Sequence, residues 1–80
     1  MQTPEIYQKL TLVLRDVFDD DAIAVGPDLT ADDVDGWDSL THIRLMLTVE
    51  KAFAIRFAAS EVGKLKNVGE LASLIASKTA

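Results

Sequence analysis

Apolar residues near the N-terminus repeat at helical spacing. The three residues before them suit a helix start, because Thr3 can cap a helix, Pro4 fits its first position and Glu5 lies at the positive end of the helix dipole. A run of aspartates at 19–21 follows, which is unfavourable at a helix C-terminus. The pattern predicts a helix from Thr3 to about Phe18. Its buried stripe is expected to be Ile6, Leu10, Val13, Leu14, Val17 and Phe18.

Residues 19–38 show no helical period and predict a long loop. Gly26-Pro27 marks a turn within it. Four irregularly spaced apolar residues are expected to hold the loop against the core: Ile23, Val25, Leu29 and Val34. A loop of this length in a small domain is uncommon, and long loops often carry function.

Helical spacing returns after the loop. Asp38 is a good N-cap for a second helix that runs to about Ala54. A short turn is expected at 60–63, and Asn67 to Glu70 resembles a capping box that opens a last helix. The apolar side of the second helix is predicted to be Leu40, Ile43, Met46, Leu47, Val49 and Phe53. For the last helix the corresponding residues are Leu71, Leu74 and Ile75.

Three main helices and one short helix predict an all-α fold, a small four-helix bundle. No segment alternates convincingly with the period of a strand, and 80 residues are expected to form a single domain over 1–80. Seven residues on the apolar stripes are expected to be largely buried: Leu10, Leu14, Ile43, Leu47, Phe53, Leu71 and Ile75.

The charge distribution narrows the possible partners. The net charge is −5, but residues 16–38 hold nine Asp and neither Lys nor Arg. Such a field repels nucleic acid and anionic lipid and attracts basic protein surfaces, although a simple solvated loop is also compatible with it. No apolar run approaches the length of a membrane span and the N-terminus does not resemble a signal peptide, so a soluble cytoplasmic protein is expected.

The residues offer little catalytic or metal chemistry. Ser39 lies in "GWDSLTHI", which lacks the glycines of the GxSxG nucleophile motif. His42 is the single histidine, and no third group is apparent that would complete a triad; a partly exposed surface position is expected for it. The aspartates do not align with a calcium-binding loop, and with one His and no Cys a dedicated metal site is not expected. Any thiol chemistry would need a thiol brought from outside the chain.

Ser39 remains informative because of its position. A serine at a helix N-terminus lies among free backbone N–H groups at the positive end of the dipole, where a phosphate is well tolerated. Two interpretations stay open on this ground alone, a plain helix-start residue and an attachment point for a phosphate-linked group.

The segment "DGWDSLTHIRLMLTVEKAFAIRF", together with "NVGELASLI" near the C-terminus, resembles acyl carrier proteins. Their signature is Asp-Ser-Leu at the start of the second helix of a four-helix bundle. The resemblance implies that Ser39, flanked by Asp38 and Leu40, carries 4′-phosphopantetheine transferred from coenzyme A by a separate phosphopantetheinyl transferase. The thiol of the arm would hold an acyl or aminoacyl group as a thioester, and the protein itself would catalyse nothing.

The same resemblance implies partner enzymes: the transferase, a loading ligase and a downstream synthase or transferase, with the carrier itself a monomer. The expected partner-contact residues are Asp33, Asp35, Trp37, Thr41, Arg44 and Met46. Fatty-acid carriers tend to be acidic along the second helix, whereas this chain has Thr41, Arg44 and Lys51 there. We therefore expect a dedicated loading enzyme and poor acceptance by generic fatty-acid enzymes. The alternative is a non-carrier helical interaction module, in which Ser39 is an N-cap or a phosphorylation site and the acidic loop binds a basic protein.

Overall fold

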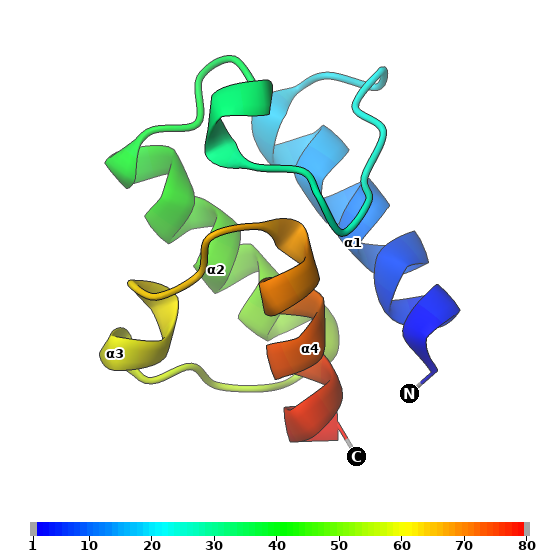
Figure 1. Ribbon diagram of the computed structural model, residues 1–80, viewed down its shortest axis with the longest axis vertical. Helices are drawn as coiled ribbons and strands as arrows, with labels where there is room; N and C mark the ends of the chain where they lie inside the picture. Colours follow the sequence, from blue (N-terminus) through cyan, green and yellow to red (C-terminus); the bar gives the residue numbers. More distant parts are fainter. Residues whose placement is uncertain (1, 80) are drawn as a thin grey trace.

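Helices and loops make up the whole of the chain that the computed structural model describes, residues 2–79 (Figure 1). The predicted all-α bundle of three main helices and one short helix is confirmed. In chain order the elements are α1 (Thr3–Phe18), the 3₁₀ turn η1 (Ala31–Asp33), α2 (Ser39–Phe53), α3 (Ala59–Val62) and α4 (Val68–Thr79). The η1 turn was not predicted.

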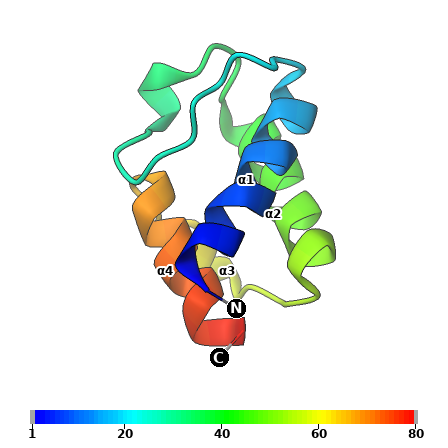
Figure 2. The same ribbon diagram turned by 90° about the vertical axis from the view of Figure 1, so that its right-hand side faces the viewer.

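The three long helices enclose the core. α1 packs chiefly on α2 and also on α4, while residues 19–38 cross one end of the bundle and the two termini lie at the other end (Figures 1 and 2). The side chains that are almost completely buried come from all three helices: Ile6, Leu10, Leu14, Leu45, Val49, Val68 and Ile75.

The ends of α1 follow from local chemistry, with one correction. The N-cap is Gln2 rather than Thr3, and the Gln2 backbone N–H donates to Glu5 Oε1 at 3.3 Å. Thr3 is therefore the first helical residue. At the other end Asp19 adopts the left-handed conformation (φ 50°) and closes the helix, as the aspartate run predicted.

The loop of residues 19–38 is held at the start of α4. The backbone N–H of Val68 donates to the Leu29 carbonyl at 2.9 Å, and that of Gly69 donates to the Pro27 carbonyl at 3.0 Å. A Cβ on Gly69 would lie 2.9 Å from the Pro27 oxygen, so this close approach needs glycine. Of the four apolar residues predicted to hold the loop, Val25 and Leu29 pack against the core, as expected. Ile23 and Val34 are each only 8% exposed but lie outside the core cluster.

The predicted register of α2 is wrong in part. Leu45 is fully buried, whereas three residues of the predicted apolar side are exposed: Leu40 at 72%, Ile43 at 55% and Leu47 at 54%. α2 carries apolar residues around most of its circumference, so its own period does not select the buried face. Packing on α1 selects the face of Leu45, Met46, Val49 and Phe53 instead. The other five residues of the predicted core, which are Leu10, Leu14, Phe53, Leu71 and Ile75, are buried as expected.

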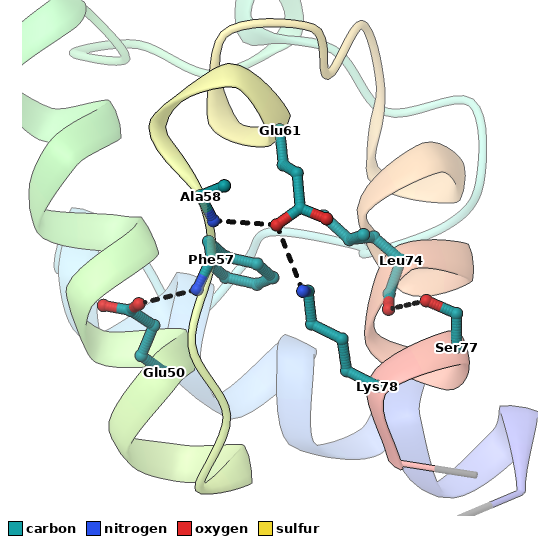
Figure 3. Close-up of polar contacts among 7 residues, drawn as sticks. All are labelled: Glu50, Phe57, Ala58, Glu61, Leu74, Ser77 and Lys78. Atoms are coloured by element: carbon teal, nitrogen blue, oxygen red, sulfur yellow. Dashed lines mark hydrogen bonds and ion pairs between the residues drawn. The ribbon is translucent and has the colours of Figure 1, made fainter.

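Polar contacts hold α3 and the segment before it (Figure 3). The Phe57 N–H donates to Glu50 Oε2 at 2.9 Å, which ties the segment to α2. Glu61 Oε1 accepts the Ala58 N–H at 2.7 Å and lies 3.1 Å from Lys78 Nζ on α4. The Ala58 hydrogen bond, and next the Lys78 ammonium, lower the pKa of Glu61. The short helix lies within one residue of its predicted position.

Candidate functional site

Asp38 caps α2 and fixes the turn before it. Its Oδ1 accepts the Thr41 backbone N–H at 2.9 Å and lies 2.8 Å from the Thr41 hydroxyl, which is also 2.8 Å from the Gly36 carbonyl. The Thr41 N–H, followed by its hydroxyl, lowers the pKa of Asp38. Gly36 has φ 86°, a backbone conformation that residues with a side chain rarely adopt. Asp38 is therefore the N-cap, as predicted.

Ser39 is the first residue of α2, and its side chain is exposed. Since Asp38 supplies the cap, the Ser39 hydroxyl is not needed to satisfy the helix end. Ser39 is exposed at the N-terminus of α2, the positive end of the helix dipole, where a phosphate is favoured. The structure thus presents one hydroxyl at a site suited to an anionic group.

Trp37 anchors the loop next to Ser39. Its ring packs on Phe18 with a centroid distance of 5.3 Å, and its Nε1–H donates to His42 Nδ1 at 3.2 Å. His42 Nε2 lies 3.2 Å from the Val62 carbonyl of α3. These two contacts together select the tautomer with the proton on Nε2, which donates to Val62. The half-buried indole is thus a structural link between the loop and α2.

These contacts also exclude the catalytic interpretation of Ser39 and His42. A general base needs a free lone pair directed at the serine hydroxyl. The single acceptor nitrogen of His42 already accepts from Trp37. The contact between Trp37, His42 and Val62 was not predicted, because no local pattern joins residues 5 and 20 positions apart.

Ser39 is one of the residues that line an open groove of about 520 Å³. Its walls are mostly apolar and come from η1, α2 and the end of α3. The lining residues include Trp37, Ile43, Val62 and Leu65. A much smaller cavity of about 60 Å³ lies beneath Trp37 and His42, far below the roughly 300–1,000 Å³ of typical ligand sites. The exposed hydroxyl and the adjoining apolar groove fit an extended, partly apolar group joined through phosphate.

The predicted partner-contact residues lie in different environments. Asp33, Asp35 and Arg44 are exposed. Asp33 Oδ2 accepts both the backbone N–H and the hydroxyl of Thr30, at 3.0 and 3.1 Å, so it also holds η1. Thr41 is partly buried in the cap. The assignment of Met46 is wrong, because its side chain is 4% exposed in the core and borders the small cavity.

Among residues 2–79 Leu40 is the most exposed large apolar residue, at 72%, followed on α2 by Ile43 and Leu47. The sequence prediction placed all three on the apolar side of the helix, and Ile43 and Leu47 in the core, and so missed them as surface residues. The available signal was the excess of apolar positions on α2 over what one buried face can hold.

Other site types find no support in the described part of the chain. Residues 2–79 contain no group of three or more His, Cys, Asp or Glu placed to hold a metal ion. No helix within this range has the length and apolar character needed to cross a membrane.

Two sequence comparisons decide the family. Residues 8–75 match the family described as phosphopantetheine attachment site. The chain is also 34% identical over 76 residues to an acyl carrier protein of Picosynechococcus sp., covering 94% of this chain and 93% of that one. The chain belongs to the acyl carrier protein family. This carrier also resembles the solution structure of holo acyl carrier protein from Geobacter metallireducens, with TM-score 0.85, 46% identity and coverage of 90% and 83% of the two chains.

The family settles the general activity. Acyl carrier proteins are non-catalytic and hold 4′-phosphopantetheine covalently, so this carrier is not an enzyme. The carrier function predicted from the resemblance is confirmed, and it displaces the alternative of an interaction module without an attached group.

Proposed function

We propose that Ser39 is the attachment residue and that a separate phosphopantetheinyl transferase modifies it. The observation that carries this proposal is that capping and exposure fall on two different residues at the start of α2. Asp38 caps the helix through Thr41, and Ser39 stands exposed in the next position. A phosphodiester on Ser39 would receive the favourable field of the helix N-terminus.

The attachment chemistry needs only the hydroxyl from this chain. Ser39 Oγ attacks the phosphorus next to the pantetheine arm of coenzyme A and forms a new P–O bond. The P–O bond to the nucleotide breaks, adenosine 3′,5′-bisphosphate leaves, and the serine proton passes to a base of the transferase. When bound, the arm supplies the thiol that a chain without cysteine lacks.

The residues around Ser39 would position the arm. The groove walls at Trp37, Ile43 and Val62 offer apolar contact for its linear part, while Asp38 keeps the turn in place. We propose that the cargo is an acyl or aminoacyl group, placed on the thiol by a loading ligase and consumed by a downstream synthase or transferase. Leu40 flanks the attachment residue and is exposed for contact with the transferase.

Intact-mass spectrometry tests the assignment. The chain is incubated with coenzyme A and a transferase of broad specificity, and one phosphopantetheine is expected to be added. Ser39→Ala should remain unmodified. It should also lose at most about 1 kcal/mol of unfolding free energy, because Asp38 provides the cap.

Ser60→Ala is the matched control, because Ser60 is also an exposed serine in the first turn of a helix. It should be modified like the parent chain. Modification of Ser39→Ala, or loss of modification in Ser60→Ala, would place the attachment elsewhere.

A further inference from the structure

Three large apolar side chains form an exposed row on α2. Leu40, Ile43 and Leu47 are 72%, 55% and 54% exposed and follow one another at spacings of three and four residues. Residues at these spacings lie on the same side of a helix. Only one other large apolar residue among those described, Leu12 on α1, is as exposed. Grouped apolar exposure of this kind marks an interaction surface.

Cations border this row. Arg44 and Lys51 are exposed on α2 and are seven residues apart, so they share one flank. Within residues 2–79 the one ion pair is between Lys78 and Glu61, so no carboxylate lies within salt-bridge distance of Arg44 or Lys51. Their charges are available to a partner.

A hollow extends the surface beyond the end of α2. It has a volume of about 420 Å³ and is lined by Leu47, Lys51, Ile55 and Arg56, with Glu50 and Ala54. Glu50 is the one acidic residue there, and its Oε2 accepts the Phe57 N–H. We call Leu40, Ile43, Leu47, Arg44, Lys51 and Arg56 the α2 face.

The charge along this surface changes sign. Eight aspartates lie in residues 19–38, ahead of Ser39, whereas the α2 face carries three cations. Since α2 rises about 1.5 Å per residue, Lys51 lies about 18 Å from Ser39 along the helix axis. A partner with an acidic patch would be attracted to the α2 face, and one with a basic patch would be repelled from it.

We propose that the α2 face docks partner enzymes whose contact patch has an apolar centre and an acidic rim. The partner's basic groups would lie opposite the loop of residues 19–38, at the entrance used by the arm. This inference rests on the carrier function proposed for Ser39. The acidic rim of such a partner has the opposite charge to the basic patch with which fatty-acid enzymes receive acidic carriers.

The test uses carrier that has been loaded with an acyl-phosphopantetheine on Ser39 and verified by intact mass. The probe is a fatty-acid ketosynthase, in its native form and in a form with two basic residues of its carrier-docking patch changed to Glu. Acyl transfer to each is measured at low and high salt. The native enzyme should be a poor acceptor whose rate rises with salt, because salt screens the repulsion.

The ketosynthase with the two Glu substitutions should accept the acyl group about tenfold faster than the native enzyme at low salt. This rate ratio is equivalent to about 1.4 kcal/mol. Replacing Arg44 and Lys51 with Gln should remove this preference and raise transfer to the native enzyme. The control replaces Thr3 and Gln8 on α1 with Glu, which changes the net charge by the same amount. It should behave like the parent, because its new charges lie off the α2 face.

Equal rates with both ketosynthases, or equal effects of the two double variants, would overturn the inference. Failure of the chain to acquire phosphopantetheine would instead overturn the proposed function, before any transfer is measured. The two failures are therefore distinguishable.

Discussion

Leu45 and Leu47 are separated by one residue on α2 but occupy opposite environments. Leu45 is fully buried, and Leu47 is 54% exposed beside Lys51. The sequence prediction chose Leu47 for the core and missed Leu45. Apolar residues occur on nearly every side of this helix, so periodicity alone cannot separate those that pack on α1 from those left for a partner.

Truncation of the two leucines measures this difference. Leu45→Ala should lower the unfolding free energy by about 2–5 kcal/mol, because it leaves a cavity in the core where α2 packs on α1. Leu47→Ala should change it by no more than about 0.5 kcal/mol, as expected for a surface site. Urea denaturation followed by circular dichroism gives both values. If Leu47→Ala instead lost more unfolding free energy than Leu45→Ala, the helix register inferred from sequence would be the correct one.

Single residues that begin or end a helix were the most predictable part of the site. Asp38 and Asn67 accept N–H groups of their own helix, and Asp19 ends α1, so each acts within a few positions of itself. The position of Ser39 followed directly from the Asp38 cap. By contrast, the bond between Trp37 and His42 depends on how the loop packs, which local sequence does not encode.

At the scale of the element, α3 depends on its neighbours. It has four residues, too few to be stable alone. One side is held by His42 through the Val62 carbonyl, and the other by Lys78 through Glu61. Val62 also lines the same groove as Ser39. Contacts from α2 and α4 therefore set the shape of the groove next to the proposed attachment residue.

Removing the His42 contact should loosen α3 without unfolding the bundle. In His42→Leu the side-chain volume is largely kept, but the bond to the Val62 carbonyl is lost, at a cost of about 1 kcal/mol. Amide hydrogen exchange at residues 59–64 should accelerate about fivefold, while exchange in α1 stays unchanged.

Trp37→Phe provides the control for this experiment. It removes the other ring contact of His42 and retains the aromatic packing on Phe18. Exchange at 59–64 should then stay close to that of the parent. Equal acceleration in both variants would show that α3 responds to general loosening of the loop rather than to the Val62 contact.

Across the whole molecule, the two kinds of carboxylate have different roles. All four glutamates accept a backbone N–H, and so hold local structure: Glu5, Glu50, Glu61 and Glu70. Within residues 2–79, three of the nine aspartates have a comparable contact: Asp20, Asp33 and Asp38. The rest of the Asp-rich segment adds negative charge with no ion pair inside the described chain. This concentration should attract a basic partner surface while destabilising the folded state through self-repulsion.

Salt should therefore stabilise this carrier. Raising the NaCl concentration from about 0.01 M to about 0.1 M shortens the Debye length from about 30 to about 10 Å and screens the aspartates from one another. If this relieves about 1 kcal/mol of repulsion, Tm rises by about 4–8 °C for a domain of this size. Replacing Asp21 and Asp35, both exposed, with Asn should raise Tm at low salt and reduce its dependence on salt. Calorimetry of the two proteins at both concentrations makes the comparison. The same salt dependence in parent and variant would mean that the repulsion lies outside the loop, and the excess charge would then matter only for partner encounter.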